Sequence, residues 1–536
     1  MKSSRDHPSS ASPLEAATKP TDRLWQRLRR ALLAILILIT GLALFYAVEN
    51  YRGWRAWKAE EARLRRAGEP LTWQELLPPV PSSEENLAAA PIYARIFDAL
   101  EGRVSARGAT SRIEAMEFFR RQALIELAPP GYKSRLPEVS TWVRGELVDV
   151  DAWAEHFRTP ERPEQVRQRF PLAPEGSPAA EQVLAALSLY EERFRQIEEA
   201  ASRPRAWFPV RYEENINALL PHASVLRNHV TALVLRGVCH LRLGHGVEAF
   251  RDWQTARRLV AALEQEPLLV SQFVRMSLHS LSMQIAWEAM AQHAWDLEKW
   301  QSVQQELGRL DFITSLHQAL RGERIMVLHT LEVARRDSSI LFDFLVSDSA
   351  DAPMWMDLAH WLPGGWFRQN MVRLSRYYSS VTGAIPSSRP LKVEWVTLGE
   401  LDQQAKQGSR APYRLLFHTL APSALNIVER SLAAQAMAHL GATAAVLEQY
   451  RLQHGQYPAG PDPLGGEKPW TRDPFDAQPL RYQRPGPASF VLYSIGPDRR
   501  DDGADVQRPG GSRWPKDLVW RIPAASVEKP ASPTPP

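Results

Sequence analysis

The chain has 536 residues, of which 44% are apolar and 24% charged, and its formal net charge is +4. This length exceeds what one hydrophobic core usually organises, so we expect two or three domains, and the ordinary apolar share excludes wholesale disorder. The small net charge, with both signs intermixed, speaks against nucleic acid as a partner. Cys239 is the only cysteine, which excludes an intramolecular disulfide and any cysteine-based metal site.

An apolar run near the N-terminus is the clearest local feature. Ala31–Val48 carries no charge over a length close to the ~20 residues that span a hydrocarbon core. A signal peptide has a shorter apolar core, and Glu49-Asn50-Tyr51 offers no small-residue cleavage site. A buried helix of this length would rarely lack every charge. We therefore expect Ala31–Val48 to be an uncleaved anchor whose partner is the lipid bilayer.

The orientation of the anchor is predicted from the layout of the chain. Basic residues on its two flanks nearly balance, so the positive-inside rule favours neither direction. A short N-terminus followed by a long folded part is typical of an anchor that leaves the N-terminus in the cytoplasm. We expect a single-pass protein of a bacterial inner (cytoplasmic) membrane, with its N-terminus inside and its body in the periplasm.

The segment after the anchor reads as a continuation of the same helix. Tyr51–Gly68 is charged and rich in alanine, and Gly68 and Pro70 provide an end to the helix. A proline-rich linker, Leu77–Ser83, follows. Its prolines favour an extended chain that leads into the next helix.

The body from 84 to 345 has mainly helical periodicity, and its clearest feature is a hairpin near 222–262. This hairpin resembles a tetratricopeptide repeat, since Gly237, Ala249, Trp253 and Ala256 stand at the small, small, aromatic and small positions of that family. The family's first-helix tryptophan and closing proline are missing. One good copy is present, whereas a solenoid needs about three. A repeat-like array and a generic helical domain both remain open.

The stretch Met354–Phe367 is rich in tryptophan. It reads either as an interfacial helix that touches the bilayer or as a hairpin buried against the body. Membrane-surface helices favour a basic polar face, and this stretch has none. We therefore expect it to be buried.

The C-terminal part predicts a helix followed by a small antiparallel sheet. Leu415–His454 has helical periodicity, and Gly455 and Pro458 end it. The periodicity then changes to two in Leu480–Tyr482 and Ser489–Ile495, which indicates short strands.

This C-terminal unit resembles the head of the major pseudopilin of type II secretion systems. The resemblance is carried, in matching order, by Ala444–Tyr450, Gly455, Tyr457-Pro458, Asp473–Asp476, Leu480, Tyr482, Leu492–Asp498 and Asp501–Asp505. In that family a calcium ion ties the last loop. The resemblance implies calcium as a cofactor and a metal site in which Asp498, Asp502 and Asp505 supply carboxylates, Asp501 being an alternative, with backbone carbonyls completing an oxygen shell.

The residues of this acidic loop allow two interpretations. Crowded carboxylates repel one another, and a hard cation would relieve that repulsion. A solvated acidic turn is the other interpretation, because Arg499 and Arg500 neutralise part of the charge. The chain also departs from true pseudopilins, whose apolar helix carries a glutamate and joins the head directly. We therefore expect an appended module rather than a pilus-type polymer.

Seven segments follow from these observations, within a mainly α fold that has an N-terminal transmembrane helix, a helical body and a small C-terminal α+β head. They are a disordered cytoplasmic stub (1–22), the anchor (23–50), a juxtamembrane helix and linker (51–83), the helical body (84–345), a Trp/Pro-rich connecting region (346–413), the pseudopilin-like head (414–523) and a disordered tail (524–536). The layout resembles membrane proteins of planctomycete and verrucomicrobial type, which implies no activity.

No catalytic motif is apparent. The chain has no phosphate-binding loop of the Walker type, no GxGxxG, no GxSxG and no HExxH, so we name no catalytic or cofactor-binding residue beyond the metal site. The sequence favours a membrane-anchored, non-enzymatic envelope protein that acts as a scaffold for other envelope proteins. The alternatives are a component of a type II secretion or pilus-like machine, and a membrane-bound enzyme whose site leaves no local motif.

Overall fold

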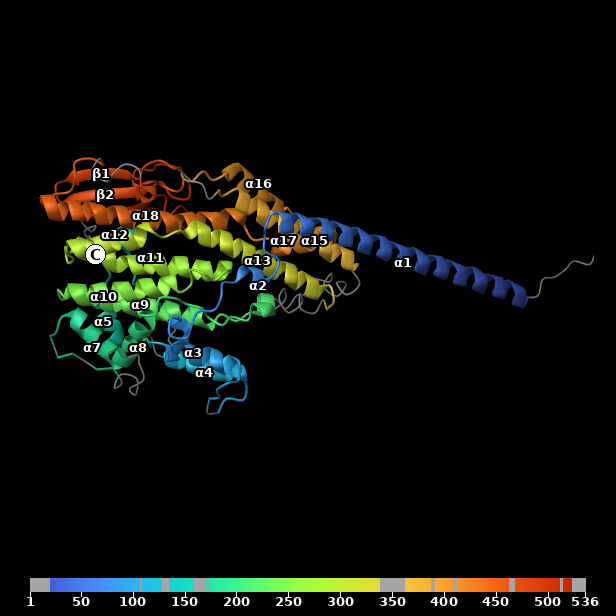
Figure 1. Cartoon of the computed structure of the whole chain (residues 1–536), viewed down its shortest axis with the longest axis horizontal. Helices are drawn as coiled ribbons and strands as arrows, with labels where there is room; N and C mark the ends of the chain where they lie inside the picture. Colours follow the sequence, from blue (N-terminus) through green and yellow to red (C-terminus); the bar gives the residue numbers. More distant parts are fainter. Residues whose placement is uncertain are drawn as a thin grey trace, which may run out of the picture.

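The computed structural model describes most of the chain as helices, with a small sheet near the C-terminus (Figure 1). The described residues are 20–106, 108–127, 135–158, 170–171, 173–174, 176–337, 362–386, 391–407, 412–461, 468–510 and 514–522. The stub before residue 20, the tail after 522 and most of the tryptophan-rich stretch lie outside them. The mainly α fold and the small C-terminal sheet are confirmed at this level.

The elements follow in chain order. The helices are α1 (Pro20–Arg66), α2 (Trp73–Leu76), α3 (Pro91–Leu100), α4 (Arg112–Ala123), α5 (Val150–Arg158), α7 (Ala179–Leu187), α8 (Glu191–Ala201), α9 (Pro221–Arg242), α10 (Gly246–Ala261), α11 (Leu269–Ala291), α12 (Leu297–Gly308), α13 (Phe312–Ala334), α15 (Gly364–Gly383), α16 (Trp395–Lys406), α17 (Pro412–Leu420) and α18 (Ala424–His454). The strands are β1 (Arg481–Gly486), β2 (Ser489–Ser494) and β3 (Leu518–Ile522).

Helix α1 runs without a break from the apolar run into the body. Among the described residues it is the one helix long and apolar enough to cross a membrane, and its apolar side chains are exposed. Figure 1 shows its N-terminal half projecting alone from the molecule. Gly68 adopts the left-handed conformation (φ +68°) just after Arg66, where the helix ends.

The C-terminal half of α1 packs closely against α15. A Cβ on Gly53 would lie 2.5 Å from the Cα of Gly365, and a Cβ on Gly365 would lie 2.5 Å from the carbonyl carbon of Glu49. The Asn50 Oδ1 accepts a hydrogen bond from the Gly365 backbone N–H at 2.8 Å. The two backbones meet directly because neither glycine carries a side chain.

Two buried carboxylates of α1, Glu49 and Glu60, follow one another along this junction, and the half-buried Glu69 just after α1 faces α13. Their hydrogen bonds run from Trp366 Nε1 to Glu49 (3.0 Å), from Ser375 Oγ to Glu60 (2.7 Å) and from Arg324 Nη2 to Glu69 (2.7 Å). Residue numbers rise together on α1 and α15, so the two helices are parallel. Burial alone would raise the pKa of Glu60, but hydrogen bonds from Arg63, Ser375 and Arg376 outweigh burial, so the pKa of Glu60 is lowered. Glu60 is therefore a paired anion inside the junction.

The segment whose sequence we compared with a tetratricopeptide repeat forms the antiparallel hairpin α9–α10. Trp253 and Ala256 are buried in it, and a Cβ on Gly237 would lie 2.9 Å from Ile285 Cδ1 and 3.3 Å from Asp252 Cβ. Gly237 thus allows α10 and α11 to approach α9 closely. The next helices pack differently, since α12 lies against α18.

The sheet has the order β1-β2-β3, and both pairs are antiparallel. Strand β2 is central and mostly buried. Strand β3 lies outside the two strands expected from sequence. Its Trp520 contacts Trp142 of the body at a centroid distance of 5.4 Å, and the Arg521 carbonyl accepts a hydrogen bond from Trp287 Nε1 at 3.2 Å.

Helix α18 lies between the sheet and the body helices α11, α12 and α13 (Figure 1). Ser423 caps its start, and Gly455, at φ +76°, ends it. Buried residues on both sides of α18 belong to one continuous core. The expected head therefore shares its core with the body, and the expected connecting region contains α15 and α16.

We expect Gly53→Ala to destabilise the α1–α15 junction, because the added Cβ cannot fit beside the Gly365 backbone. Overpacking of this kind costs about 1–3 kcal/mol, which would lower the melting temperature of the full chain in detergent by several degrees. Gly399→Ala in α16 is the control, since its Cβ would meet no atom within 4 Å. Equal melting temperatures for the two variants would contradict the close packing.

Candidate functional site

The acidic loop follows β2 and folds back over the outer face of the sheet. Its Ala504 (φ +70°) packs with Val491, Tyr493 and Val519 in a small separate cluster. Asp501 is turned toward the sheet, where its Oδ1 accepts a hydrogen bond from the Tyr493 hydroxyl at 3.0 Å. Asp501 thus has a structural partner within the protein.

The other aspartates of the loop face Lys516 or one another. Lys516 Nζ lies 2.8 Å from Asp505 and 3.8 Å from Asp502. Burial raises the pKa of Asp498, and the neighbouring Asp502 carboxylate adds to that shift. The structure therefore brings Asp498 and Asp502 together and ties Asp505 to a lysine.

Asp517 is a further carboxylate at this loop, and sequence reasoning missed it. It is fully buried, its Oδ2 accepts a hydrogen bond from the Asp505 N–H at 3.0 Å, and its Oδ1 has no hydrogen-bond partner. Burial raises its pKa to about 6. In the described residues no group of three or more ligating side chains is arranged to hold a metal ion. Calcium stays a prediction.

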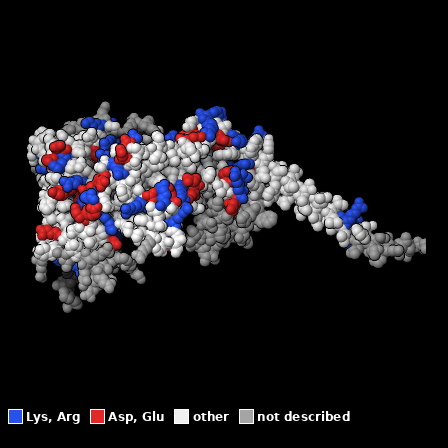
Figure 2. Space-filling model, turned by 60° about the horizontal axis from the view of Figure 1, so that its bottom comes forward, with Lys and Arg blue, Asp and Glu red and all other residues white. Residues whose placement is uncertain are grey.

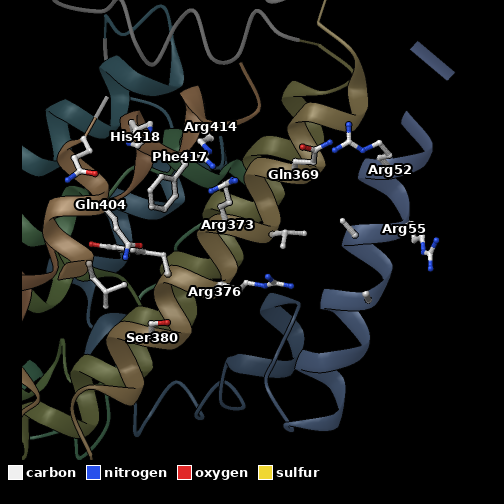
Figure 3. A pocket seen from close by; sticks show the side chains of 16 residues that line it. Arg52, Arg55, Gln369, Arg373, Arg376, Ser380, Gln404, Arg414, Phe417 and His418 are labelled. Carbon is white, nitrogen blue, oxygen red and sulfur yellow. The ribbon is translucent and has the colours of Figure 1, made fainter. Parts of the chain in front are cut away.

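A second site, which we call the arginine groove, lies where α1 meets α15, α16 and α17 (Figure 3). Its volume is about 920 Å³. Its lining includes the basic Arg52, Arg55, Arg373, Arg376 and Arg414, the neutral polar Gln369, Ser380, Gln404, Gln407 and His418, and the apolar Val372, Tyr377, Leu401 and Phe417. No acidic side chain lines it among the described residues.

The positive charges of the arginine groove are unevenly compensated. Arg52 pairs with Glu49 at 2.6 Å, and Arg376 pairs with Glu60 at 3.2 Å. Arg373 and Arg414 have no carboxylate partner within the described part of the chain. Burial and then the nearby Arg414 guanidinium lower the pKa of Arg373.

Aromatic rings lie beside these arginines, and two of them, Tyr377 and Phe417, line the groove. Arg373 and Arg414 both lie over the Tyr413 ring, each 5.9 Å from its centroid. Phe417 packs edge-on against Tyr377 at 5.6 Å. In Figure 3 the Arg373 and Arg414 side chains converge, whereas Arg55 extends from the far side of α1. The groove therefore has a rigid wall and a concentrated positive charge.

Sequence reasoning missed the arginine groove because no local motif encodes it. Arg52, Arg373 and Arg414 lie hundreds of residues apart in the chain or on different helices. Elsewhere, acidic and basic side chains are intermixed on the face that Figure 2 shows. Arg373 and Arg414, which have no carboxylate partner among the described residues, set the groove apart from that face.

A buried polar cluster in the body bears on the enzyme alternative. The Arg257 guanidinium lies 2.8 Å from His279 Nδ1 and donates a hydrogen bond to Ser282 Oγ at 3.0 Å. Burial lowers the pKa of Arg257 to about 9 and the pKa of His279 well below its usual value. These residues are buried and line neither the arginine groove nor the acidic loop.

Comparison with known proteins gave no match: no family model, no curated protein and no solved structure is significantly similar to the chain. The pseudopilin and tetratricopeptide resemblances therefore rest on the residues named for them. Function has to be argued from the anchor, the arginine groove and the acidic loop.

Proposed function

We propose that the protein is a membrane-anchored, non-enzymatic scaffold of the cell envelope that holds its helical body in a fixed orientation at the bilayer surface. The rigid junction of α1 with α15 carries this proposal. A flexible tether would let the body rotate freely, whereas the Gly53–Gly365 contact and the buried Glu60 fix α1 to the body. A fixed orientation presents the same faces of the body to other envelope proteins.

The α4 face of the body is the surface we propose for such a partner. Ile113 and Phe118 of α4 are 48% and 41% exposed. Beside Phe118 a cavity of about 460 Å³ is lined by Phe118, Arg121 and Arg193. Ile113, five residues before Phe118, projects about 140° away around the helix and does not line this cavity. Aromatic and arginine side chains are enriched at protein interfaces and at their energetic centres. Another envelope protein with an apolar side chain fits this surface.

We expect a photo-reactive amino acid in place of Phe118 to cross-link to one reproducible partner protein in native membranes. The matched position is Arg258, an exposed residue of α10, where we expect no such adduct. Arg121→Glu in the Phe118 probe should abolish the adduct, because Arg121 lines the same cavity one turn away and the reversed charge is costly to bury in the interface. A Phe118 probe that cross-links no more than the Arg258 probe would contradict the scaffold.

We further propose that the N-terminus lies in the cytoplasm and the body in the periplasm of a bacterial inner membrane. Reporter fusions after Leu71 and at the C-terminus test this orientation. We expect activity from a reporter that works only outside the cytoplasm, since both positions follow the one candidate span found among the described residues. Activity of a reporter that works only in the cytoplasm would refute it.

The pseudopilin resemblance supports a calcium site in the acidic loop, with Asp498, Asp502 and Asp505 as ligands. The supporting observations are the juxtaposed Asp498 and Asp502 and the unpartnered Oδ1 of the buried Asp517 beside them. Calcium would neutralise these carboxylates and join the loop to the end of β3. A role in a type II secretion or pilus-like machine would rest on this resemblance.

We expect millimolar calcium to raise the melting temperature of the full chain relative to chelator, because a ligand that binds only the native state stabilises it. Asp502→Ala should abolish the difference, whereas Asp151→Ala on the exposed face of α5 should preserve it. The full chain is needed because α18 shares its core with the body. Identical melting in calcium and chelator would leave a solvated acidic turn.

A further inference from the structure

We propose that the arginine groove binds a phosphate-bearing anion, and that its natural source is the headgroup of an acidic phospholipid in the membrane that α1 enters. This inference goes beyond the scaffold role, because it assigns a ligand to a site that the scaffold does not need. It rests on charge, geometry and the position of the groove relative to the apolar run.

The charge of the groove favours an anion. The guanidinium groups of Arg373, Arg376 and Arg414 are close enough to repel one another, and only Arg376 has a carboxylate partner among the described residues. Like charges held together at a partly buried site raise the free energy of the empty groove. A bound anion removes that repulsion, so the groove gains stability when it is occupied.

The donor geometry favours phosphate in particular. A guanidinium presents a planar fork of N–H donors that matches two oxygens of a phosphate group. Arg373 and Arg414 reach the groove from two different helices, α15 and α17, and stand over the same Tyr413 ring. Two guanidinium groups that approach from different directions can hold one phosphate. Gln369 also lines the groove (Figure 3), and its amide N–H donates a hydrogen bond to Glu49 at 3.3 Å.

The position of the groove favours a lipid as the source. Arg52, at the membrane-proximal end of the groove, follows Val48, the end of the apolar run, by four residues, which at 1.5 Å per residue places it about 6 Å beyond the hydrocarbon edge. Arg376 pairs with Glu60, twelve residues after Val48, so the inner end of the groove lies about 18 Å beyond that edge. The headgroup layer extends about 5–7 Å beyond that edge. The exposed Tyr51 and Trp54 rings stack 6.1 Å apart at the same level, where interfacial aromatic side chains lie.

The inner arginines lean toward the bilayer. Helix α15 is parallel to α1, so its N-terminal end is the membrane-proximal end. Side chains on a helix point back toward its N-terminus, which for Arg373 is the membrane-proximal end of α15. A headgroup whose acyl chains stay in the bilayer can therefore meet the membrane-proximal end of the groove, toward which the Arg373 side chain extends.

The test uses the full chain in nanodiscs of phosphatidylcholine alone or with phosphatidylglycerol. Two readouts are measured: the acidic lipid retained per protein in native mass spectrometry, and the melting temperature. We expect Arg373→Gln/Arg414→Gln to lower the retention of acidic lipid about tenfold, since charge-assisted hydrogen bonds to phosphate are lost. Phosphatidylglycerol should raise the melting temperature of the wild type and leave that of the double variant unchanged.

Arg251→Gln/Arg258→Gln is the matched control, because it removes the same charge from exposed positions on α10, outside the groove. It should behave as the wild type does. Arg414→Gln alone is a second variant that keeps the test valid if the double variant does not fold, because Arg414 is exposed and packs little. It should lower acidic-lipid retention by at least about threefold, as one of two forks is lost.

A separate arm distinguishes the two sources of phosphate. Inorganic phosphate is added at millimolar concentration to the protein in phosphatidylcholine nanodiscs. One outcome is that phosphate raises the melting temperature of the wild type but not that of the Arg373→Gln/Arg414→Gln variant, while phosphatidylglycerol has no effect. That result would support the anion site and reject the lipid as its source. Equal lipid retention and equal melting responses in the groove variants, the control and the wild type would overturn the proposal.

Discussion

The direct contact between the backbones of α1 and α15 is the constraint on which the membrane-proximal half of the molecule depends. Glycine at both Gly53 and Gly365 lets the helices approach within backbone distance, and any side chain there would separate them. At this separation the polar groups of each helix reach the other. The Asn50 amide can thus satisfy the Gly365 N–H, which begins α15 and would otherwise lack a partner.

The close contact also explains why carboxylates can be buried beside a membrane anchor. An unpaired buried charge costs several kcal/mol, so Glu49 and Glu60 are tolerated because donors of α15 stand opposite them. Glu49 and Glu60 neutralise part of the positive charge of the junction, because they pair with Arg52 and Arg376. The remaining charge, on Arg373 and Arg414, is left for a ligand. One packing arrangement therefore both fixes the body to the anchor and produces the arginine groove.

Features encoded within one segment could be predicted from the sequence, and features formed between distant segments could not. The apolar run, the helix end near Gly68 and the capping Gly455 each follow from local composition and backbone preference. The pairing of α1 with α15 could not be predicted, since no local sequence feature marks Gly53 and Gly365 as contact positions between two helices. Asp517 was missed for the same reason. It comes close to the acidic loop only because β3 pairs with β2.

A chain of hydrogen bonds through α18 shows why the C-terminal sheet and the body form one folding unit. On the body side, Gln435 accepts a hydrogen bond from the Phe312 N–H at 2.8 Å and donates to the Leu310 carbonyl at 2.9 Å. Gln435 also contacts His439 Nε2 at 2.9 Å, and His439 Nδ1 lies 2.7 Å from the Arg472 carbonyl on the opposite side. Removing the body on one side of α18, or the segment around Arg472 on the other side, would leave buried hydrogen-bonding groups unpaired, which costs about 1–3 kcal/mol for each group. A head of this kind cannot be detached without loss, even if its sequence pattern belongs to an independent module elsewhere.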